Sequence, residues 1–308
     1  MQNKQKMSEW IAGFLAADPP RSKSLLTTIF GDAIVPHGGT AWMGSLIELL
    51  APFGVNDRLL RTSVFRLAQE GWLGAQRDGR RSAYAITPDA MQRFSRAYRR
   101  VYAPLHNDWD GQWTLVLGSS GLDAAERGAL RKELLWEGYC LIAPGIAGHP
   151  AGDGEALQAL LERCGLRDKV FVCKAAEAPG MQARPLGELV AEGWDLSGVV
   201  DGYRQFLVHF APLLDLIEDG QKMTAEQAFV ARTLLIHAYR RVQLHDPHLP
   251  VALLPEPWPG AAAYELARAL YRALYREAEE HLMRALHRED ASAPEADASF
   301  YQRFGGLD

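Results

Sequence analysis

The chain has 308 residues, of which 48% are hydrophobic and 23% are charged. At roughly 100–200 residues per domain, this length predicts two or three domains with hydrophobic cores. The composition excludes a disordered or collagen-like chain, and no apolar run reaches the ~18 residues that a membrane-spanning helix needs. The apolar patch within residues 1–20 is interrupted by charges and does not resemble a secretory signal. Three cysteines without a CxxC pair fit free thiols, and we expect a cytoplasmic protein.

Charge is unevenly distributed along the chain. Residues 21–104 contain twelve Arg or Lys and six Asp or Glu, a net charge of +6, whereas residues 105–308 contain nineteen and thirty, a net charge of −11. A basic segment joined to an acidic body favours a local polyanion-binding module. Solvated arginines that cluster by chance would give the same counts, so the pattern of elements has to decide.

The basic segment predicts three helices in succession. Residues 24–30 form a short apolar helix, and Thr40 is expected to cap a second one. Asn56 is a good N-cap for a third helix over residues 56–71. The apolar face of this third helix consists of Leu60, Val64 and Leu67. Its other faces carry Arg58, Arg61, Thr62, Arg66 and Gln69.

A basic hairpin is predicted to follow the third helix. Residues 72–77 and 80–86 are strand-like runs joined by Asp78–Gly79, a strong hairpin signal. Thr87 then caps a fourth helix that runs to about Tyr102. Three helices followed by a hairpin are typical of a winged helix-turn-helix, whose third helix reads the major groove while the wing contacts phosphates. The expected wing residues are Arg77, Arg80 and Arg81.

The pattern changes after the basic segment, which we assign with its connecting helix to residues 21–104. Residues 105–190 alternate strands and helices, which predicts a small ferredoxin-like α+β domain with a loop over residues 144–154. Residues 191–290 predict an all-helical domain, and residues 291–308 a frayed tail. The expected strands are 113–117, 139–143 and 169–173, and the expected helices are 122–137, 155–164, 196–218, 224–243 and 260–287. Five prolines in residues 247–259 require a packed connector or a wrapping loop between the last two helices.

No enzyme signature is present in the sequence. The histidines lack HxxxH or HExxH spacing, and we find no phosphate-binding glycine loop. Asp108 and Asp110 precede the first strand of the middle domain and could hold Mg²⁺ in a nuclease, although a solvated turn explains them as well. We therefore predict no catalytic residue, no metal site and no cofactor.

Two strings in the sequence resemble the PaaX family, the repressors of the phenylacetate-degradation operon. The first lies near the N-terminus and consists of two neighbouring segments, SLLTTIFGDAIVPHGG and LAPFGVNDRLLRTSVFRLAQEGWL. The second lies near the other end of the sequence and reads ARTLLIHAYRRVQLHDPHLPVALLPEPWPG. The resemblance implies a GntR-like winged helix, a middle domain resembling small CRISPR-associated nucleases, and a helical C-terminal domain. It further implies a homodimeric repressor that phenylacetyl-coenzyme A releases from operator DNA. His245 stands where the family usually has Arg, which puts the choice of acyl-CoA in doubt.

An acyl-CoA effector would need cations beside an aromatic-lined cleft. Residues of these types surround the connector: Arg232, Tyr239, Arg240, Arg241, His245 and Trp258. Pairing of Arg240 and Arg241 with acidic helices of their own domain is the alternative. Two further functions stay open, a metal-dependent nuclease built on the middle domain and a DNA-binding adaptor without a small-molecule effector.

Overall fold

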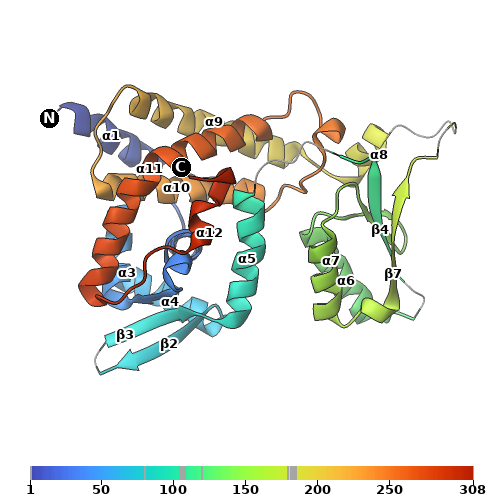
Figure 1. The fold of residues 1–308 in the computed structure, drawn as a ribbon, viewed down its shortest axis with the longest axis horizontal. Helices are drawn as coiled ribbons and strands as arrows, with labels where there is room; N and C mark the ends of the chain where they lie inside the picture. Colours follow the sequence, from blue (N-terminus) through green and yellow to red (C-terminus); the bar gives the residue numbers. More distant parts are fainter. Residues whose placement is uncertain are drawn as a thin grey trace. The chain divides into compact units, whose positions relative to one another are not determined.

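The structure, a computed structural model, describes residues 2–79, 81–103, 109–118, 121–178, 180 and 186–307 (Figure 1). The chain forms two compact units, which are described separately. The first unit comprises Met1–Pro104, Tyr203–Leu244 and Gly260–Asp308, and the second comprises Leu105–Gly202 and His245–Pro259. The predicted helical domain of residues 191–290 is therefore not a separate body, since its last two helices pack with the basic segment while the connector belongs to the second unit.

The first unit is built mainly from helices. Side-chain caps begin several of them, as the sequence predicts: Asn56 accepts a hydrogen bond from the Leu59 amide at 2.9 Å, and Thr87 accepts one from the Ala90 amide at 3.2 Å. α10 and α11 pack along each other and against α2 and α3 respectively. The helices are α1 (Gln2–Ala17), α2 (Ser22–Ile29), α3 (Met43–Leu50), α4 (Asp57–Gln69), α5 (Pro88–Tyr102), α9 (Ser197–Glu218, from residue 203 on), α10 (Ala225–Gln243) and α11 (Gly260–Glu289).

A three-stranded antiparallel sheet completes the N-terminal part of this unit. Its strands β1 (Thr40–Trp42), β2 (Leu73–Asp78) and β3 (Arg81–Ile86) lie in the order β1-β3-β2. The predicted hairpin is confirmed, but Asp78 pairs with Arg81, so the second strand begins one residue later than expected. Thr40 does not cap α3: it pairs with Ala85 of β3, because the extended backbone before the helix finds a free strand edge there.

The second unit contains a four-stranded antiparallel sheet in the order β5-β6-β4-β7. With two helices between the strands, this is the connectivity and strand order of a ferredoxin-like fold. One expectation is wrong: β6 lies within the predicted loop of residues 144–154, where Gly145 turns with φ +79° and Ala147 is buried. The elements are β4 (Gln112–Gly118), α6 (Ala124–Trp136), β5 (Cys140–Ala143), β6 (Ile146–His149), α7 (Gly154–Cys164) and β7 (Val170–Ala176).

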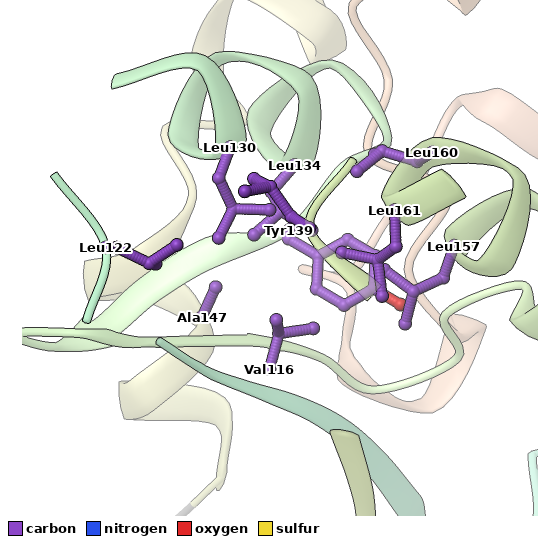
Figure 2. Packing of buried hydrophobic residues seen from close by; sticks show 10 residues of the cluster. Val116, Leu122, Leu130, Leu134, Tyr139, Ala147, Leu157, Leu160 and Leu161 are labelled. Atoms are coloured by element: carbon purple, nitrogen blue, oxygen red, sulfur yellow. The ribbon is translucent and has the colours of Figure 1, made fainter. Parts of the chain in front are cut away.

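Both faces of this sheet are covered. Figure 2 shows the core beneath α6 and α7, where Val116 of the sheet meets Leu130 and Leu134 of α6 and leucines of α7. Leu135, the next residue of α6, is exposed. On the other face Trp113 packs with Trp194 and with α8 (Leu186–Gly193), a helix that the sequence analysis did not predict.

The proline-rich connector belongs to that second layer. Leu249, Leu253, Leu254 and Trp258 join the cluster around Trp113. The Pro247 carbonyl oxygen lies 2.8 Å from Nε2 of His149. The sequence-based expectation of an ordered, packed connector is confirmed.

The C-terminal end was expected to fray, and this is wrong. Residues 297–307, here called the C-terminal hook, contain α12 (Ala298–Tyr301) and bury Phe300, Arg303 and Phe304 in the first unit. Asp297 caps the short helix by accepting a hydrogen bond from the Ser299 amide, and its own amide donates to the Pro36 carbonyl at 3.0 Å. Burial of two phenylalanines offsets the entropy lost on ordering the segment.

Two further expectations can be compared with the structure. The three cysteines are free thiols, as their spacing indicates. Within the described part of the chain, no helix has the length and hydropathy needed to cross a bilayer.

Candidate nucleic-acid interface

α4 separates its residues cleanly between core and surface. Leu60, Val64 and Leu67 are buried as predicted, together with Ser63, whose Oγ lies 2.9 Å from the Ser22 hydroxyl oxygen. The opposite face carries side chains at spacings of three and four residues, so they form one stripe along the helix. All five predicted members are exposed: Arg58, Arg61, Thr62, Arg66 and Gln69.

The stripe has few internal partners that a ligand would have to displace. Nε of Arg61 lies 2.7 Å from a carboxylate oxygen of Asp57 one turn earlier, and both side chains are more than half exposed. Such a surface pair is worth about 0.3–0.5 kcal/mol and exchanges readily for another anion. The Thr62 hydroxyl donates to the Arg58 carbonyl at 2.9 Å, which leaves its lone pairs available as acceptors.

Sequence reasoning missed two exposed apolar side chains on this helix. Leu59 is 46% exposed and Phe65 is 60% exposed, and Phe65 lies on the stripe between Thr62 and Gln69. The signal was available, because Phe65 falls outside the helical face that Leu60, Val64 and Leu67 define. Phe65 therefore adds an apolar contact surface to the polar stripe.

The arginines of the hairpin differ in their exposure and in their partners. Arg77 is exposed on β2. Arg81 is held within the unit: its guanidinium stacks 4.3 Å from the centre of the Trp42 ring and pairs with Glu289 at 2.8 Å. Arg80 lies outside the described residues. In the free protein Arg81 therefore attaches the hairpin to the end of α11 instead of extending from the tip.

A charged cluster occupies the middle of the first unit. Oδ1 of Asp32 accepts hydrogen bonds from the hydroxyls of Tyr102 and Tyr271 at 2.7 and 2.9 Å and from Arg303 at 3.1 Å. The other carboxylate oxygen lies 3.2 Å from Nε of Arg232. Arg232 also pairs with Glu279 at 2.5 Å. The guanidinium groups of Arg232 and Arg303 therefore face the carboxylates of Asp32 and Glu279.

Burial and these charges together shift the pKa values of the cluster. Burial alone would raise the pKa of Glu279, but Arg232 and the hydrogen bond from His37 lower it to about 2. Burial raises the pKa of the Tyr271 hydroxyl, so this donor keeps its proton. Asp32 and Glu279 compensate the positive charge of Arg232, which is fully buried. Its expected role as an effector contact is therefore corrected to a structural one.

The six residues predicted to bind an effector do not form one site within either unit. Tyr239 is fully buried and accepts a hydrogen bond from Gln243. Arg241 is exposed and pairs with Asp18 near the end of α1 at 2.6 Å, and Arg240 lines a cavity. In the second unit, His245 is exposed and Trp258 packs in the layer over the sheet.

His237 predicts a pH dependence of stability. It is buried against Thr28, and burial together with the charges of Arg240 and Arg241 lowers its pKa to about 4. Between about pH 6.5 and pH 4 the unfolded chain binds a proton that the native histidine does not, so the free energy of unfolding falls by about 3 kcal/mol as the pH falls. Urea unfolding at pH 7.5 and pH 5 should show a smaller loss for His237→Asn. An equal loss in the variant and the wild type would contradict this assignment.

The described residues contain no group of three or more His, Cys, Asp or Glu side chains placed to hold a metal ion. Asp110 is exposed, and its carboxylate accepts a hydrogen bond from the Gln112 amide at 2.9 Å. Asp108 lies outside the described residues. The carboxylate of Asp110 thus takes part in a local turn, which fits a solvated turn better than a Mg²⁺ site.

Comparison with known proteins defines the class to which this chain belongs. Three family models match successive segments: PaaX-like protein over residues 21–90, PaaX protein central Cas2-like domain over 106–186, and PaaX-like protein C-terminal domain over 194–284. The chain is 35% identical to the transcriptional repressor PaaX of Escherichia coli strain K12 over 304 residues, 98% of this chain and 96% of that protein. The class is that of non-enzymatic transcriptional regulators.

Within that class, this chain belongs to the PaaX family of transcriptional repressors. A solved structure shares its fold: an uncharacterized protein from Mycobacterium tuberculosis matches with a TM-score of 0.51 and 22% identity, over 86% of this chain and 99% of the other.

Proposed function

We propose that α2, α3 and α4 with the three-stranded sheet form a winged helix-turn-helix that binds operator DNA. The observation that carries this proposal is the division of α4 into a buried apolar face and an exposed stripe of arginine, threonine and glutamine. A helix with this surface fits the major groove of B-DNA. The hairpin of β2 and β3 follows in the position of a wing (Figure 1).

The side chains of the stripe suit the edges of bases. Arg61 and Arg66 can donate two hydrogen bonds to guanine, and Gln69 can exchange two with adenine. Phe65 supplies an apolar contact for a thymine methyl group. Arg77 and Arg80 would meet phosphates, as would Arg81 once released from Glu289, and these contacts position the protein without specifying sequence.

Substitutions should separate these two roles. Arg61→Ala or Arg66→Ala is expected to weaken operator binding by about 1–3 kcal/mol and to relax base preference, because a base contact is lost. Arg77→Ala, or Arg80→Ala with Arg81→Ala, should weaken binding to operator and random DNA alike and reduce the salt dependence. Mobility shifts at several salt concentrations measure both effects.

Arg241→Ala, which removes an exposed arginine paired with Asp18, is the control. Wild-type binding by all of these variants would contradict the proposal.

We also propose that the protein represses genes of phenylacetate catabolism as a homodimer and that phenylacetyl-CoA releases it from DNA. Support comes from family membership and from the name of the Escherichia coli relative, a transcriptional repressor. A dimer would place two copies of α4 in successive major grooves about 34 Å apart. To lower operator affinity a hundredfold, the effector must prefer the state that does not fit DNA by about 2.7 kcal/mol. Such a repressor would work in the cytoplasm, where the chromosome lies.

A mobility shift with the upstream region of the protein's own gene tests this function. We expect a discrete complex that phenylacetyl-CoA disperses and that coenzyme A alone does not. A complex that no acyl-CoA disperses would favour an adaptor without a small-molecule effector. Absence of any specific complex would overturn the repressor model itself.

A further inference from the structure

A cavity of about 410 Å³ lies within the first unit. Its wall comes from α2 and the helical turn that follows it, from α5, from α10 and from the C-terminal hook. Three aromatic side chains of α5 line it, Phe94, Tyr98 and Tyr102, and Ile236 of α10 adds apolar surface. The rings of Tyr98 and Tyr102 lie 4.9 Å apart between their centres. Such a lining suits a flat, apolar group.

A cation without a carboxylate partner stands in this wall. Among the described residues, the guanidinium of Arg240 makes one hydrogen bond, to Oγ of Ser24 at 3.3 Å, and its Nε is covered without any partner. Burial lowers the pKa of Arg240, in contrast to Arg232, whose pKa the facing carboxylates raise. A half-buried cation that lacks a counter-charge costs folding free energy and favours an oxygen acceptor from a ligand.

We propose that this cavity binds the acyl end of an aromatic acyl thioester, with the ring among the aromatic side chains of α5 and the thioester carbonyl accepting a hydrogen bond from Arg240. The proposal rests on the proposed function, whose effector site it locates. A volume of about 410 Å³ accommodates an arylacetyl group and the start of its thioester arm, but not a whole coenzyme A. Arg99 also lines the cavity and is exposed, so a second cation is available to the phosphates outside.

The cavity is mechanically linked to the hairpin. Phe94 faces it and also packs on Trp72 with 5.6 Å between ring centres, and Arg93 stacks over the same indole at 5.0 Å. Phe94 also packs tightly on Gly31, because a Cβ added at that glycine would lie 2.8 Å from the Phe94 ring. A ligand that displaces the Phe94 ring would therefore also disturb its contact with Trp72, at the base of β2. This is a direct route from the cavity to the proposed wing.

Calorimetric titration of the full-length protein with phenylacetyl-CoA and with coenzyme A alone tests the site. Ala97→Phe places a ring in the cavity, and Ala262→Phe makes the same change at an exposed position of α11. Arg240→Met removes the cation of the cavity. Arg241→Met removes its exposed neighbour, which pairs with Asp18 and does not line the cavity, contrary to its expected effector role. We expect wild type to bind phenylacetyl-CoA at least tenfold more tightly than coenzyme A. Ala97→Phe and Arg240→Met should each weaken the acyl-CoA at least tenfold, with the two controls within twofold of wild type.

The outcomes distinguish the site from the function. If phenylacetyl-CoA binds wild type and releases the operator, and does so equally from both cavity variants, the cavity is not the effector site although the proposed function stands. If wild type does not bind phenylacetyl-CoA, the effector part of the proposed function fails and the cavity proposal fails with it. Operator binding without ligand confirms that each variant has folded. If Ala97→Phe does not bind the operator, the acyl-CoA affinities of Arg240→Met and Arg241→Met are compared alone to test the site.

Discussion

Replacing Asp32 with alanine is expected to destabilise the first unit by about 3–5 kcal/mol, because it leaves Arg303 and Arg232 buried with too little negative charge. The carboxylate of Asp32 also accepts hydrogen bonds from two buried tyrosines, whose hydroxyls would lose their partner. Hydrogen exchange of the amides in α10 and α11, measured at increasing urea concentration, reports the lost free energy of unfolding of this unit.

An exposed pair provides the control for Asp32. Asp18→Ala breaks the ion pair with Arg241, whose side chain is 54% exposed, and should change stability by about 1 kcal/mol or less. If both variants lost the same small amount, the cluster around Asp32 would not be a determinant of the fold.

The second large effect is expected from the C-terminal hook. Phe304 is 1% exposed and packs against Tyr102 and Tyr271, each with 5.4 Å between ring centres. Phe304→Ala removes this aromatic contact and leaves a cavity, so we expect a loss of about 3–5 kcal/mol. Thermal and urea unfolding measure it, with Tyr301→Ala, whose side chain is 44% exposed, as a control that should cost about 1 kcal/mol or less. A frayed tail, as the sequence suggested, would make the two variants alike.

Local signals made much of the fold predictable. The third helix and the last three long helices follow from caps and apolar periodicity, both of which act within a few residues. The errors arose where the partner lies far away in the sequence. Thr40 extends because β3 offers it a strand edge, and residues 146–149 form a strand because β4 and β5 flank them. Neither pairing leaves a mark in the local pattern.

The candidate interface was predictable for the same reason, since the phase of one helix separates Leu60 and Val64 from Arg58 and Arg61. The burial of Arg232, which the sequence suggested as an effector contact, was not predictable in this way. Arginine in a sequence reads as exposed, yet Arg232 and Arg303 are among the most buried side chains of the protein. Their burial depends on Asp32 and Glu279, which only the tertiary structure brings to them.

The C-terminal hook also makes the folding of the first unit depend on residues that lie far apart along the chain. Phe300, Arg303 and Phe304 pack beside Asp32 of the N-terminal segment and the tyrosines of α5 and α11. In a variant shortened before the hook, Asp32 would lose one of its two guanidinium partners, and Tyr102 would lose its contact with the ring of Phe304. Such a variant would contain an open aromatic gap in its core, and we expect proteases to cleave it faster than the unshortened chain.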